Sequence, residues 1–121
     1  MMKIYRVSYI TPTIEGYTPK ERGDQDRPPR VSLPENHARA IFRGILDMSY
    51  FDDSISTWQL LTKLAMITPY RIQEYSIEHK RPWSDPVYAS MPEAYIKKKL
   101  QEIEDLANWA TDNGYSTIKV F

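Results

Sequence analysis

The sequence predicts a small α+β domain, in which three strands form a mixed or antiparallel sheet against three helices. Three observations support this class: an N-terminal segment alternates with period two, three serine-initiated runs carry helical apolar stripes, and a short alternating segment ends the chain. The length of 121 residues suits one compact domain over residues 1–121.

The first predicted element is a strand over residues 3–10, "KIYRVSYI". Tyr5, Val7 and Tyr9 fall on one face of an extended chain, and the residues between them fall on the other. Residues 11–30 then form a predicted flexible, charged loop that contains four prolines. Seven of its last eleven residues are charged. A connection of this length is either a functional loop or disordered.

The first predicted helix covers residues 33–50. Ser32 and Glu35 have the spacing of a capping box, which satisfies free backbone N–H groups at a helix start. Gly44 weakens a helix interior, so we expect close packing there. The apolar stripe consists of Ala38, Ile41, Phe42, Ile45 and Leu46.

The second predicted helix covers residues 55–67 and begins with another capping box, Ser56 and Gln59. Pro69 is expected to end it, and a strand over 69–78 is expected to follow. The alternation of this strand slips once, which predicts either burial on both faces or a bulge.

The third predicted helix covers residues 91–112 and again follows a capping box, Ser90 and Glu93. A left-handed stop at Asn113 and Gly114 leads into a predicted strand over 115–121.

Composition narrows the classes of function. Sixteen Lys and Arg balance sixteen Asp and Glu, so nucleic-acid binding is not favoured. The absence of cysteine and of a long apolar run predicts a cytoplasmic protein without a membrane partner. No metal site is expected, because His37 and His79 lack partners at ligand spacing. No serine-nucleophile or glycine-rich phosphate motif is present.

Arg6 is a charged residue within an otherwise apolar and aromatic strand. Such a side chain must be paired, reach solvent at a sheet edge or line a pocket.

The order of segments resembles small ADP-ribosyltransferase-like domains, including RES-type relatives. The resemblance rests on "IYRVS", "RVSLPENHARAIF", "YRIQEYSIEHKRPWSD" and "ANWATDNGYSTIKVF". It implies that Arg6 and Ser32 bind the nicotinamide dinucleotide NAD. The catalytic Glu of that family normally lies beyond the strand similar to "STIKVF", where this chain stops. The resemblance therefore does not predict catalysis, and no cofactor is expected outside this alternative.

The leading prediction is a small intracellular protein that binds another protein. Nine tyrosines and three tryptophans exceed what a minimal core needs, and both residue types favour binding surfaces. Size and the truncated enzyme-like plan suit an accessory protein of a phage or mobile element, such as an inhibitor of a host defence enzyme. The expected contact residues are Tyr17, Arg22, Arg27, Arg30, Trp83 and Tyr88.

Two alternatives stay open. One is the NAD-binding enzyme or nucleotide binder described above, and the other is an oligomeric structural protein. The long final helix and the tyrosines would supply the interface of the oligomer.

Overall fold

The computed structural model describes residues 8–18, 27–48, 54–79 and 91–120, and it has the predicted α+β class. Its strands are β1 (Tyr9–Ile10), β2 (Thr13–Ile14), β3 (Leu33–Pro34), β4 (Ile55–Ser56) and β5 (Thr117–Lys119). Its helical segments are α1 (Glu35–Arg39), the π-helix η1 (Ala40–Ile45), α2 (Thr57–Ala65), α3 (Pro69–Glu74), the 3-10 turn η2 (Ile77–His79) and α4 (Glu93–Asp112).

The paired strands of the described ranges are antiparallel. β1 pairs with β3, and β5 lies between β2 and β4 in a separate three-stranded sheet. Each strand has only two or three residues, so the ladders contribute few hydrogen bonds. The helices and their apolar contacts therefore hold most of the structure together.

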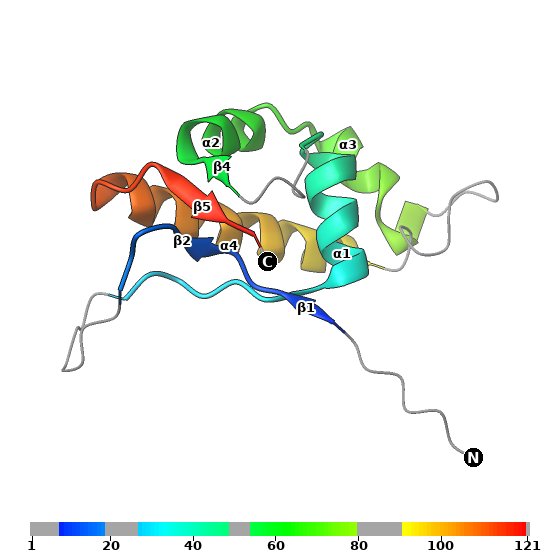
Figure 1. Ribbon diagram of the computed structural model, residues 1–121. Helices are drawn as coiled ribbons and strands as arrows, with labels where there is room; N and C mark the ends of the chain where they lie inside the picture. The colour runs from blue at the N-terminus through cyan, green and yellow to red at the C-terminus, as the bar shows by residue number, and fades with distance from the viewer. Residues whose placement is uncertain (1–7, 19–26, 49–53, 80–90, 121) are drawn as a thin grey trace, which may run out of the picture.

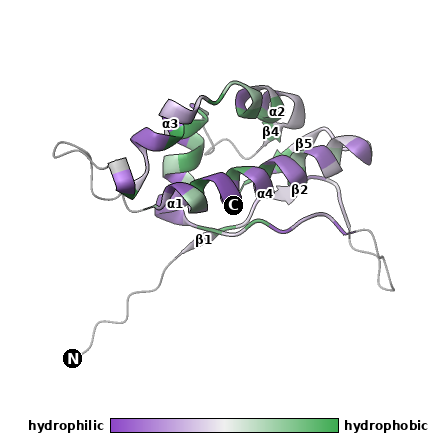
Figure 2. Ribbon diagram, turned by 180° about the vertical axis from the view of Figure 1, so that it is seen from behind, coloured by the Kyte–Doolittle hydropathy of each residue, from purple (hydrophilic) through white to green (hydrophobic). Residues whose placement is uncertain are grey.

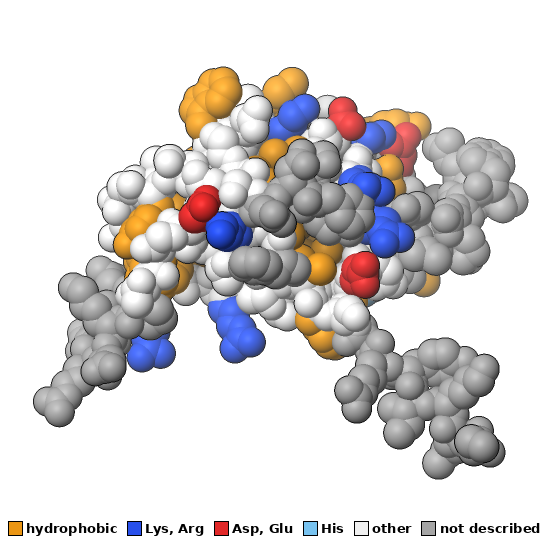
Figure 3. Space-filling model, viewed as in Figure 1, with side chains coloured by type: hydrophobic (Ala, Val, Ile, Leu, Met, Phe, Trp, Pro, Cys, Tyr) orange, Lys and Arg blue, Asp and Glu red, His pale blue; other side chains and the backbone are white. Residues whose placement is uncertain are grey.

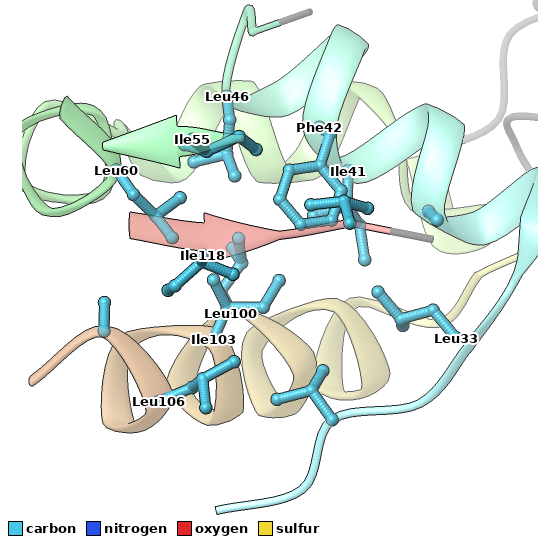
Figure 4. Close-up of a cluster of buried hydrophobic side chains, with 14 of the residues drawn as sticks. Leu33, Ile41, Phe42, Leu46, Ile55, Leu60, Leu100, Ile103, Leu106 and Ile118 are labelled. Atoms are coloured by element: carbon cyan, nitrogen blue, oxygen red, sulfur yellow. The ribbon is translucent and has the colours of Figure 1, made fainter. Parts of the chain in front are cut away.

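The buried hydrophobic side chains form one cluster. In Figure 4, Ile118 of β5 lies between Phe42 of η1 on one side and Ile103 of α4 on the other. In the view of Figure 1, the helix α4 runs across the molecule below α2 and behind β5. Hydrophilic and hydrophobic residues alternate along α4 (Figure 2), as expected of a helix that buries one face.

Several predicted elements match the described chain. The helix predicted over 91–112 is α4, the helix predicted over 55–67 contains α2, and the strand predicted over 115–121 contains β5. Within the strand predicted over 3–10, β1 covers the last two residues, while residues 3–7 lie outside the described part. Gly114 has a φ of 82°, which confirms the left-handed stop.

The strand predicted over 69–78 is wrong. Residues Pro69–Glu74 form α3, because the Thr68 hydroxyl caps its start by accepting a hydrogen bond from the Arg71 amide at 3.2 Å. Pro69 occupies the first turn, where its missing N–H costs nothing.

The first predicted helix also needs correction. Ser32 does not cap it, since the structure begins the helix at Glu35 after an extended Pro34 that makes no side-chain cap bond. From Ala40 to Ile45 the chain widens into the π-helix η1. Within the predicted loop 11–30, residues Thr13 and Ile14 form β2, and 19–26 lie outside the described part.

Among the helices of the described ranges, none combines the length and the apolar character that a membrane span requires.

Candidate functional site

The predicted binding residues are only partly described. Arg6, Arg22, Trp83 and Tyr88 lie outside the described residues, so their assignment stays a prediction. Tyr17, Arg27, Arg30 and Ser32 are described, and the structure brings Tyr17 and Arg30 to the same pocket.

This pocket, which we term the proline groove, has a volume of about 490 Å³. It lies between residues 11–14, which include β2, and residues 28–30, and Leu106 of α4 completes the lining. Arg27 is exposed just before this segment but does not line the groove. The lining residues are Thr11, Pro12, Thr13, Ile14, Tyr17, Pro28, Pro29, Arg30 and Leu106.

Tyr17 is held in place by an aromatic cluster. Its ring meets those of Trp109 and Tyr115 edge-on, at centroid distances of 5.5 Å and 6.1 Å, while Trp109 and Tyr115 stack on each other. The Tyr17 hydroxyl is buried and has no hydrogen-bond partner among the described residues. One wall of the groove is therefore a fixed aromatic ring.

Ser32 lies at a different place, beside α4. Lys99 Nζ donates to its backbone carbonyl at 3.3 Å and pairs with the Glu102 carboxylate at 3.0 Å. The NAD site implied by the resemblance would join Ser32 with Arg6, which the structure does not describe. That pairing stays a prediction.

An ionisable pair neighbours Lys99. His37 Nδ1 lies 3.0 Å from the Tyr95 hydroxyl, and the Lys99 ammonium lies 5.7 Å from the Tyr95 ring centroid. Burial, followed by the Lys99 charge, lowers the pKa of His37. Burial, followed by Glu102 and then Tyr9, raises the pKa of Tyr95. Both shifts favour uncharged rings, as expected for a packing contact between α1 and α4.

A second group of surface residues was missed by the sequence reasoning. Trp58 of α2 is 73% exposed, Met66 at the end of α2 is 70% exposed, and Tyr70 of α3 is 57% exposed. We call these three residues the α2–α3 surface. Hydrophobic side chains project into solvent over α2 in Figure 3. The available signal was limited to Met66, which falls outside the apolar stripe formed by Leu60, Leu61, Leu64 and Ala65.

A pocket of about 320 Å³ adjoins the α2–α3 surface. Met66 belongs to both, and the Lys63 and Arg71 side chains contribute cations to the lining. The other lining residues are Ile45, Leu46, Asp47, Ile67 and Thr68.

Arg71, which lines this pocket, is hydrogen-bonded to η1. The Arg71 guanidinium donates to the Gly44 carbonyl at 2.7 Å and to the Glu74 carboxylate at 3.0 Å. Arg71 also lies 5.6 Å from the centroid of the Tyr75 ring. A Cβ at Gly44 would come within 2.5 Å of that ring, which confirms the close packing predicted for this glycine.

Within the described ranges, histidine and carboxylate side chains form no group of three that could hold a metal. No protein-family model matches the chain, and no curated protein or solved structure matches it either.

Proposed function

We propose that this chain is a protein-binding domain and that the α2–α3 surface makes the central contact with its partner. The observation that supports this most directly is the exposure of Trp58, Met66 and Tyr70 on the consecutive helical segments α2 and α3. Tryptophan, tyrosine and methionine are enriched in protein interfaces, and burying such side chains dominates binding free energy.

The adjoining pocket supports the same proposal. Its mixed lining, with Met66 and Ile67 beside Lys63 and Arg71, suits an apolar side chain of a partner that carries a nearby acceptor group. Arg71 is already oriented by its bonds to Gly44 and Glu74. An oriented side chain loses less conformational entropy when it binds.

A binding domain of this kind acts by occupying the surface of another protein, as an inhibitor does. We propose this mode for the chain and place it in the cytoplasm, in keeping with its lack of cysteine. An accessory protein of a phage or mobile element, directed at a host enzyme, is the biological setting that we propose.

The test compares three versions of the full chain as bait for proteins of a candidate host. They are the wild type, the double variant Trp58→Ala/Tyr70→Ala and the control Tyr9→Ala. Tyr9 is a matched control because it is 62% exposed but lies on β1. We expect a partner that the wild type and Tyr9→Ala retain, and whose affinity the double variant lowers at least a hundredfold.

Circular dichroism establishes that all three versions are folded. Retention of every partner by the double variant contradicts the proposal, and so does equal loss with Tyr9→Ala. Light scattering adds a separate arm: a wild-type dimer that the double variant converts to a monomer would identify a second copy as the occupant. That result would replace the proposal with the oligomeric alternative.

A further inference from the structure

The proline groove is built from parts of the chain that the α2–α3 surface does not use. Its walls come from residues 11–14, Tyr17 and residues 28–30, and Leu106 of α4 completes it. Its volume of about 490 Å³ falls within the range of pockets that hold small organic ligands.

The lining of the groove is mainly apolar. Pro12, Pro28 and Pro29 have no backbone N–H, so three lining positions cannot donate a main-chain hydrogen bond. Ile14, Leu106 and the Tyr17 ring add further apolar area. An apolar ligand body suits these walls better than an extended polar peptide, which needs main-chain partners.

The described lining of the groove carries positive charge. Of the described residues that line it, Arg30 alone is charged, and Thr11 and Thr13 contribute hydroxyl groups. The acidic residue that follows β2, Glu15, accepts from the Ser54 hydroxyl at 3.2 Å and lies 3.8 Å from Lys119 Nζ. Arg30 is exposed, so its guanidinium can meet an incoming anion.

We infer that the proline groove binds a small organic acid with an apolar body and one carboxylate. The body packs against the prolines, Tyr17 and Leu106, and the carboxylate pairs with Arg30. This site is independent of the protein-binding function proposed above.

The test uses 2-naphthoate, which has a rigid apolar body and one carboxylate, and its neutral analogue 2-naphthalenemethanol. Each is titrated into the ¹⁵N-labelled full chain while amide chemical shifts are followed. We expect the largest shifts at Thr13, Ile14, Tyr17 and Leu106, and a lower dissociation constant for 2-naphthoate than for the alcohol.

Two charge-matched variants locate the anion. Arg30→Gln should raise the dissociation constant of 2-naphthoate about fivefold and leave that of the alcohol unchanged, because the removed ion pair is exposed to solvent. Arg27→Gln removes the same charge from an exposed residue outside the lining and should leave both constants unchanged.

The inference is overturned if millimolar 2-naphthoate shifts no groove amides, or if the shifts cluster elsewhere. It is also overturned if Arg27→Gln weakens binding as much as Arg30→Gln, since the effect would then be one of general charge. Folding of both variants is visible in the same spectra. The partner-capture experiment has its own baits and readout, so either proposal can fail without the other.

Discussion

His37 connects α1 to α4 through a contact whose strength depends on its protonation state. Its ring lies edge-on to Tyr95, with centroids 5.2 Å apart, and Lys99 approaches from the same helix as Tyr95. The lowered pKa means that the unfolded chain binds a proton more readily than the folded one. Stability is therefore fully present above the unfolded pKa of about 6.5 and falls as the pH drops through that value.

We expect the free energy of unfolding of the wild type to decrease between about pH 7 and pH 5 because of this residue. His37→Gln should remove that part of the pH dependence, as measured by urea unfolding at a series of pH values. His79→Gln serves as the control for a general loss of one histidine. If the unfolding free energy of His37→Gln depends on pH as strongly as that of the wild type, His37 does not cause the pH dependence.

Capping residues were predictable from the sequence where the cause of the cap is local. Ser56 caps α2, accepting a hydrogen bond from the Gln59 amide at 3.5 Å as its capping box predicts. The cap predicted at Ser32 is wrong, because Pro34 is extended and delays the helix start to Glu35. The exposure of Trp58 depends on which face of α2 packs on α4, which only the tertiary fold decides.

The proline at the start of α3 is a sequence signal that is compatible with two structures. A proline can follow the end of one helix or begin the next; α2 already ends at Ala65, and Pro69 begins α3. The predicted strand took only the first meaning into account. The shift in alternation between Ile72 and Tyr75 is a three-residue helical step, and both side chains pack against the core. Short segments such as β2, with two residues, give no periodicity that could have been read.

Because η1 and α3 pack closely, we expect the effect of Gly44→Ala on the unfolding free energy to change sign when Tyr75 is replaced. Gly44→Ala forces the Tyr75 ring to move away from its position beside Arg71, so we expect a loss of about 1 kcal/mol in unfolding free energy. In a Tyr75→Leu background the obstructing ring is absent. The same substitution should then stabilise the protein by up to about 1 kcal/mol through helix propensity.

Denaturant unfolding of the four proteins measures this coupling directly. Equal effects of Gly44→Ala in both backgrounds would contradict the close packing between η1 and α3.

For the whole molecule, the important feature is that the described elements share one core. The sequence predicted much of this core from the stripes of the first and third helices, but not the central position of β5 (Figure 4). That position depends on contacts between Ile118 and residues far away in the chain. A defect in the core should therefore weaken every element together.

We expect Ile103→Ala to lower the free energy of unfolding by about 2–5 kcal/mol, because Ile103 is 1% exposed at the centre of α4. Ile77→Ala is the matched control, since Ile77 is 48% exposed, and its effect should stay within about 0.5 kcal/mol. Urea unfolding followed by far- and near-ultraviolet circular dichroism should give coincident transitions in both variants. Separate transitions in Ile103→Ala would show that the elements do not share one cooperative core.

The stacking of Trp109 on Tyr115, with Tyr17 edge-on to both, has a practical consequence. Tyr17 lines the groove, so a molecule entering it alters the environment of an indole one ring away. In a chain where Trp58 and Trp83 are replaced by phenylalanine, the emission spectrum of Trp109 becomes an intrinsic fluorescent reporter. Occupancy could then be followed without any attached dye.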